Sequence, residues 1–137
     1  MTAIDIPEAV ATRGRVLVAD DDNDVRRLLT ANLEFEGYTV AGCDNGDDAR
    51  SLARTMAPDV IVLDVMMPKR DGFDVLAALK SNPATRGIPV VLLSAKANDE
   101  DVWKGWRAGA DYYVTKPFNL DELLRFIEQA VTRVARP

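Results

Sequence analysis

Residues 16–24 read Val-Leu-Val-Ala-Asp-Asp-Asp-Asn-Asp, a short apolar run that ends in a cluster of acidic residues. Val25, Leu28, Leu29 and Leu33 follow at the spacing of one helix face. A continuous apolar run that leads into a helical period is typical of a fully buried strand followed by a helix. The stretch therefore predicts one strand–helix unit with carboxylates at the junction.

The same unit recurs along the chain. Four more apolar runs each precede a segment of helical period: 38–41 before 47–56, 60–63 before 73–79, 89–93 before 102–106, and 112–115 before 120–134. Alternating strands and helices favour a mainly parallel sheet covered by helices on both faces. We expect an α/β fold of the flavodoxin-like, doubly wound type. It has a five-stranded parallel sheet in the order 2-1-3-4-5 and five helices.

The composition narrows the function. The chain has 137 residues, the usual size of one domain, and a formal net charge of −5. That charge disfavours a domain whose main task is to grip nucleic acid phosphates. The absence of histidine excludes catalytic triads and zinc sites that need this residue. We therefore expect neither direct nucleic acid binding nor histidine-based catalysis.

The sequence also indicates where the protein works. It contains no apolar run of about 18 residues for a membrane span, and residues 1–14 lack the apolar segment of a secretory signal. A single cysteine, Cys43, cannot form an internal disulfide and is expected to be a small buried residue with no redox task. These features predict a cytoplasmic protein with no membrane partner.

Polar residues follow four of the apolar runs. Asp20 and Asp21 come after the first, Asp64 after the third, Ser94 after the fourth and Lys116 after the fifth. In open parallel sheets, ligands bind beyond the carboxyl ends of the strands. Each residue alone is equally compatible with the N-cap of the next helix. Together, three carboxylates at one edge repel one another unless a cation joins them, and Mg²⁺ suits carboxylates and waters. The pattern predicts a magnesium site at this edge.

Five motifs in this order resemble the receiver domain of bacterial two-component response regulators, a phosphoacceptor domain of the chemotaxis-regulator type. They are Val-Leu-Val-Ala-Asp-Asp-Asp at 16–22, Val-Leu-Asp-Val-Met-Met-Pro at 62–68, Asp-Gly at 71–72, Leu-Leu-Ser-Ala-Lys at 92–96 and Ala-Gly-Ala-Asp-Tyr-Tyr-Val-Thr-Lys-Pro-Phe at 108–118. The similarity runs from about residue 15 to about residue 133. It implies an N-terminal tail at 1–14 and a receiver domain at 15–135.

The resemblance implies that Asp64 accepts a phosphoryl group from a phosphohistidine on a sensor histidine kinase or phosphotransfer protein. It implies Mg²⁺ as the cofactor, bound by Asp21, Asp64 and the backbone carbonyl of Met66, with Asp20 acting through a water. Such a domain catalyses only its own phosphorylation and dephosphorylation, so we do not expect an enzyme. Because the chain lacks histidine, the donor imidazole must come from another molecule.

Two further roles follow from the resemblance. Ser94 would hydrogen-bond the phosphoryl group and Lys116 would pair with it, since transfer to a carboxylate requires shielding of the anionic oxygens.

The resemblance also implies that the Lys116–Pro117 peptide bond is cis, although most bonds of this kind are trans. Met66 and Lys96 stand two residues after Asp64 and Ser94, where the family tunes hydrolysis. They imply a longer-lived phosphorylated state than in the fast chemotaxis type.

The resemblance also implies a switch and an output surface. Ser94 would move toward the phosphoryl group and the Tyr113 ring would turn into the space. The alternative is that Tyr113 is a half-buried strand aromatic. The output surface would comprise the helix around 102–106, the strand 112–115 and the helix 120–134, and it would bind a downstream protein target. Trp103 is a candidate anchor there, whereas Trp106 falls in the apolar period and is expected to be buried.

The sequence disfavours two enzyme classes and leaves two other functions open. A phosphatase that forms an aspartyl phosphate needs an acid two residues after the nucleophile, where Met66 stands. Neither glycine-rich nucleotide-binding motif follows a strand. A receiver-like binding module that works without phosphorylation and a receiver domain cut from a longer transcription regulator or signalling enzyme both remain open. As given, the chain is expected to act as a stand-alone receiver, either monomeric or dimeric on phosphorylation.

Overall fold

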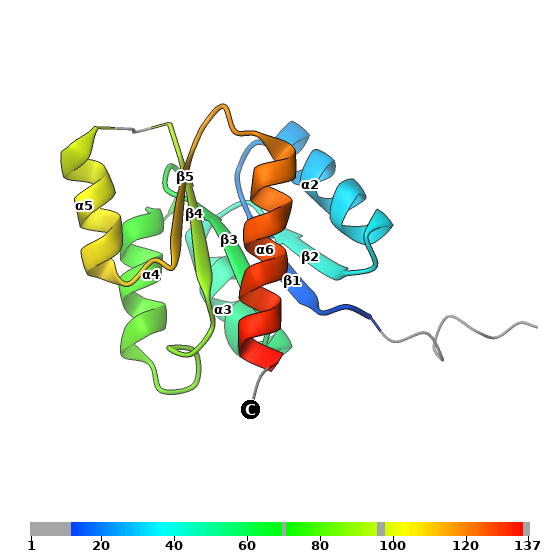
Figure 1. The fold of residues 1–137 in the computed structure, drawn as a ribbon. Coiled ribbons are helices and arrows are strands. Elements are labelled where there is room, and N and C mark those ends of the chain that lie inside the picture. Colours follow the sequence, from blue (N-terminus) through cyan, green and yellow to red (C-terminus); the bar gives the residue numbers. More distant parts are fainter. Residues whose placement is uncertain (1–11, 70, 96–97, 136–137) are drawn as a thin grey trace, which may run out of the picture.

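The computed structural model describes residues 12–69, 71–95 and 98–135. Strands and helices alternate along this part of the chain (Figure 1). In order they are β1 (Arg15–Ala19), α2 (Asn23–Phe35), β2 (Thr39–Cys43), α3 (Gly46–Met56), β3 (Val60–Asp64), α4 (Gly72–Ser81), β4 (Val90–Ser94), α5 (Asp99–Ala108), β5 (Tyr112–Thr115) and α6 (Leu120–Ala135). The five predicted strand–helix units are confirmed.

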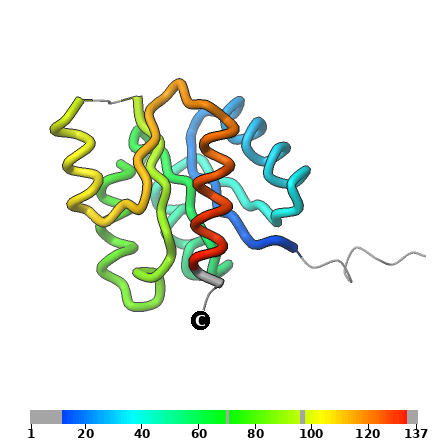
Figure 2. Tube along the Cα trace, viewed as in Figure 1, coloured from blue at the N-terminus to red at the C-terminus, as the bar shows by residue number. Residues whose placement is uncertain are grey.

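The strands form one parallel sheet in the order β2-β1-β3-β4-β5, which confirms the predicted flavodoxin-like topology. The chain winds outward twice from β1, first to β2 at one edge and then through β3 and β4 to β5 at the other. Helices α2 and α6 cover one face of the sheet, and α3, α4 and α5 cover the other (Figures 1 and 2).

Each face of the sheet carries its own hydrophobic core. Leu17, Ile61 and Leu63 point to the face under α3, α4 and α5, whereas Val16 and Val62 point to the face under α2 and α6. Successive strand residues project to opposite faces, so a strand covered on both sides buries every residue. This explains why β3 and β4 are apolar almost without interruption, and why these runs identified the strands in the sequence.

All five helices of the described residues begin after an Asp or Asn, and at α6 the Asn119 side chain accepts a hydrogen bond from the Glu122 N–H. Asp22, Asn45, Asp71 and Asn98 have extended backbones, and their side chains accept hydrogen bonds from backbone N–H groups of the first helical turn. None of these caps is one of the predicted site residues. The capping alternative weighed for Asp20, Asp21, Asp64 and Ser94 therefore does not account for them.

Helix α5 corrects one expectation from the sequence. Trp106 is 46% exposed and Trp103 is 63% exposed, so the burial predicted for Trp106 is wrong. The residue of α5 that is buried is Gly105, which lies against Tyr113 and Leu92. Because the helix approaches the sheet through a residue without a side chain, its large apolar residues are carried to the flanks and the outer face.

The predicted tail of residues 1–14 falls largely outside the described residues, and its boundary stays a prediction. Within the described part, Arg13 packs over the Tyr38 ring and its guanidinium pairs with Glu36 and Glu128. In the same part of the chain, no helix combines the length and the apolar character needed to cross a membrane.

Candidate functional site

The predicted site residues lie together at the carboxyl edge of the sheet. Asp64 and Ser94 are the last residues of β3 and β4, and Asp20 and Asp21 directly follow β1. One carboxylate oxygen from each of Asp20, Asp21 and Asp64 lies within 4.8 Å of the other two. Asp20 and Asp64 are buried and Asp21 is exposed, so the cluster has a buried base and an open side.

Lys116, just after β5, reaches this cluster from across β3 and β4. Its Nζ lies 2.9 Å from Oδ2 of Asp20 and 3.3 Å from Oδ1 of Asp64. The peptide bond between Lys116 and Pro117 is cis, the geometry that the resemblance implies. Burial would lower the pKa of Lys116, but the two carboxylates outweigh it and raise the pKa, so the ammonium stays charged.

The charge of the cluster is not balanced by Lys116. Burial first, and then the nearby Asp20 carboxylate, raise the pKa of Asp64 to about 6, although Lys116 and the Met66 N–H act to lower it. Three carboxylates face one ammonium. A site with excess negative charge, oxygen ligands and one open side suits a hard divalent cation that keeps some of its waters. The donor set therefore fits Mg²⁺.

Backbone hydrogen bonds hold the strand ends in place. Asp20 N–H donates to the Cys43 carbonyl at 3.1 Å, and Lys116 N–H donates to the Ser94 carbonyl at 2.8 Å. Arg26 on α2 adds a contact that the sequence did not predict, because its Nη1 donates to the Asp20 carbonyl at 2.8 Å. This hydrogen bond fixes the turn that carries Asp20 and Asp21 without placing a cation on their carboxylates.

Gly72, the first residue of α4, packs directly on the backbone of the strand end at Asp64. A Cβ on this glycine would lie 2.7 Å from Cα of Val65 and would overlap the Asp64 carbonyl oxygen. Gly72 N–H also donates to the Val65 carbonyl at 2.8 Å. The absence of a side chain thus lets α4 start where it supports Asp64. The sequence offered Gly72 only as part of a motif, with no role attached.

The remaining predicted residues have different surroundings. Ser94 is fully buried beside the cluster, and Tyr113 is partly buried against the core under α5. Met66, two residues after the end of β3, is 55% exposed. Lys96 lies outside the described residues, so its predicted influence on hydrolysis is not addressed by the structure.

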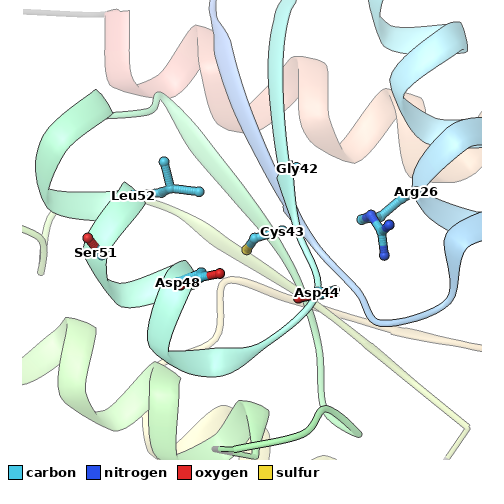
Figure 3. A pocket seen from close by; sticks show the side chains of 7 residues that line it. All are labelled: Arg26, Gly42, Cys43, Asp44, Asp48, Ser51 and Leu52. Carbon is cyan, nitrogen blue, oxygen red and sulfur yellow. The ribbon is translucent and has the colours of Figure 1, made fainter.

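A cavity of about 530 Å³ lies beside β2 rather than at the acidic cluster (Figure 3). It is lined by Arg26, Gly42, Cys43, Asp44, Asp48, Ser51 and Leu52, none of which is a predicted site residue. Cys43 is buried as expected, and burial raises the pKa of its thiol to about 11. The thiol is therefore protonated at neutral pH and a poor nucleophile.

Acidic groups, a hydroxyl and an amine thus meet at the carboxyl end of a doubly wound sheet. The sequence profile of the response regulator receiver domain matches residues 16–128. The chain belongs to this family, and its receiver domain is that of two-component response regulators.

Two relatives carry the names of transcriptional regulators. The chain is 39% identical over 122 residues to the DNA-binding dual master transcriptional regulator RpaA of Synechocystis, covering 89% of this chain and 51% of that protein. It is 44% identical over 110 residues to the probable transcriptional regulatory protein TcrX of Mycobacterium tuberculosis, covering 80% of this chain and 46% of that protein. The chain thus spans about half the length of the curated relatives it matches.

Solved structures of receiver domains share the fold. The Francisella response regulator 1452 receiver domain superposes with a TM-score of 0.83 at 36% identity, covering 88% of this chain and 98% of that one. A receiver domain of a histidine kinase from Syntrophus aciditrophicus superposes with a TM-score of 0.84 at 32% identity, covering 90% and 94%. The same fold thus occurs in chains of different overall design.

Proposed function

We propose that Asp64 accepts a phosphoryl group from a phosphohistidine of a sensor histidine kinase or phosphotransfer protein, with Mg²⁺ bound. The observation that carries the proposal is the convergence of Asp20, Asp21 and Asp64 within 4.8 Å, with Lys116 at 2.9 and 3.3 Å from two of them. Three separate strand ends, those of β1, β3 and β5, supply these groups, which a purely structural ion pair does not require.

Each residue has a task in the transfer. An Asp64 oxygen bonds to phosphorus as the bond between phosphorus and the donor imidazole breaks. Asp21, Asp64 and the Met66 carbonyl would hold Mg²⁺, with Asp20 acting through a water, and the cation would supply positive charge to the phosphoryl oxygens. Lys116 would leave its contact with Asp64 to pair with the phosphoryl group, and the Ser94 hydroxyl would donate to it.

The signal would leave through α5, β5 and α6, the surface that Tyr113 would connect to the site. Trp103 is a candidate anchor for a downstream protein target there, since exposed tryptophans are frequent at the energetic centres of interfaces. The protein would act in the cytoplasm, without binding nucleic acid directly, as a monomer or a phosphorylation-dependent dimer. It would have no catalytic activity beyond its own phosphorylation and dephosphorylation.

The lengths of the relatives favour a second context for the same chemistry. The matched segment makes up 51% of RpaA and 46% of TcrX. In such a context the receiver domain would control a DNA-binding part of a longer regulator rather than a separate partner. An immunoblot of the native protein, compared with the 15.0 kDa chain, distinguishes the two contexts.

The test is incubation with acetyl phosphate and Mg²⁺ followed by intact-mass measurement. We expect one phosphoryl adduct on the wild type and none on Asp64→Asn. Asp71→Asn serves as the control, because Asp71 caps α4 beside the site without belonging to the cluster, and it should retain the adduct. An adduct on Asp64→Asn would place the acceptor elsewhere. No adduct on any variant would favour a binding module that works without phosphorylation.

A further inference from the structure

Gly105 is a glycine inside a helix whose backbone does not require one. It lies in the middle of α5 with helical geometry, and it is absent from the glycines with positive φ. Glycine costs a helix interior roughly 1 kcal/mol relative to alanine, because it loses more backbone entropy on folding. We therefore expect that a neighbouring group requires the glycine at this position.

The Tyr113 ring occupies the place of the missing side chain. A Cβ on Gly105 would lie 2.7 Å from Cδ2 and 2.9 Å from Cε2 of the ring, and 3.1 Å from Cδ1 of Leu92. Carbon atoms that are not bonded to one another pack at about 3.5 Å or more, so even an alanine would force the ring or the helix to move. The ring thus rests directly on the helix backbone.

This contact lies on the side of the sheet that carries Ser94. Tyr113 pairs with Leu92 across β4 and β5, and Ser94 follows Leu92 by two residues, so all three side chains project to the same face. The carbonyl of Gly105 also accepts the N–H groups of Gly109 and Ala110, which close the helix and lead into β5. The contact with the ring and the hydrogen bonds that end α5 therefore meet at one residue.

We propose that Gly105 is a positioning residue for Tyr113, and that the size of residue 105 determines the balance between the positions of the Tyr113 ring. The ring cannot approach the helix as closely once residue 105 carries a side chain, so the free energy of this ring position rises relative to any other. This inference rests on the proposed function, because the ring position is taken to be coupled to the phosphoryl group through Ser94.

The test is a double-mutant cycle between Gly105→Ala and Tyr113→Ala, read by the Mg²⁺-dependent affinity for beryllofluoride, a mimic of the phosphoryl group. Both tryptophans of the chain lie on α5 beside Gly105, so their fluorescence reports binding. We expect Gly105→Ala to change the affinity by about threefold or more, and to have almost no effect in the Tyr113→Ala background. Gly87→Ala is the matched control, since a Cβ there meets nothing within 4 Å.

Several results would overturn the proposal. An unchanged affinity in Gly105→Ala would do so, and so would an equal change in both backgrounds, because the effect would then not pass through the ring. If Gly105→Ala fails to fold, the double variant decides the matter: recovery of folding on removal of the ring supports the contact, and failure to recover refutes it. A wild type that does not bind beryllofluoride at all refutes the proposed function instead. The same cycle measured by urea unfolding then tests the contact, and an absence of coupling there refutes it.

Discussion

Replacing Asp64 with asparagine is expected to stabilise the metal-free protein at neutral pH, although it removes the predicted phosphoacceptor. Burial, followed by the Asp20 carboxylate, raises the pKa of Asp64 from 3.8 to about 6. At about 1.4 kcal/mol for each pH unit between these values, ionised Asp64 costs the fold about 3 kcal/mol. The side chain is almost completely buried, so solvent does little to reduce this cost.

The direction of the pH dependence follows from the difference in proton binding between the folded and unfolded states. The folded state holds the Asp64 proton more tightly than the unfolded state, so the free energy of unfolding falls as the pH rises from about 4 to about 6. Above about pH 6 this loss of stability is nearly complete. Asparagine has the same shape and does not ionise. The stability advantage of Asp64→Asn should therefore grow from near zero at about pH 4 to about 3 kcal/mol at about pH 7.5.

The assay is urea unfolding of both proteins in EDTA across this pH range, with Asp44→Asn as a control for the loss of an exposed carboxylate at the same edge of the sheet. A variant no more stable than the wild type at about pH 7.5 would show that ionised Asp64 does not destabilise the fold, and so would an advantage that is independent of pH. Adding Mg²⁺ should stabilise the wild type more than Asp64→Asn, because only the wild type offers all three carboxylates.

Three more perturbations follow from the geometry. Gly72→Ala should lower the Mg²⁺ affinity at least about tenfold by pushing on the backbone of Asp64, whereas Gly87→Ala should leave it unchanged; equal affinities in a titration would contradict this. Asp111→Ala should destabilise the fold by about 1–3 kcal/mol in urea, because the Val90 N–H loses its acceptor and Lys80 and Arg133 each lose an ion pair. Met66→Asn should shorten the life of the phosphoryl adduct, because it replaces an exposed apolar side chain two residues after Asp64. The decay is followed by intact mass after removal of acetyl phosphate, and an unchanged rate would contradict this prediction.

The fold could be predicted because local sequence and tertiary environment agree. The strands buried on both faces are continuous apolar runs, so their ends are sharply marked, and the rule for parallel sheets then places Asp20, Asp64 and Ser94 at one edge. The position of Lys116 follows in the same way from the end of β5. In each case, a residue that directly follows or ends a strand in the sequence lies at the carboxyl edge of the sheet.

The parts that could not be predicted depend on distances between elements. Trp106 fits an apolar helical period, but the period does not say which residue faces the sheet, and Gly105 takes that place. An unexplained glycine inside a helix was the available signal, because its cost implies a close approach. The contact of Gly72 with the Asp64 backbone and that of Arg26 with the Asp20 carbonyl likewise depend on how a helix is placed against a strand end.

The most direct test is a crystal structure of the protein with Mg²⁺ and beryllofluoride. We expect beryllium bonded to a carboxylate oxygen of Asp64, Mg²⁺ on Asp21, Asp64 and the Met66 carbonyl, and the amine of Lys116 against a fluorine. Beryllofluoride on a different side chain, or a cation bound away from Asp21 and Asp64 with Lys116 still on Asp20, would contradict it.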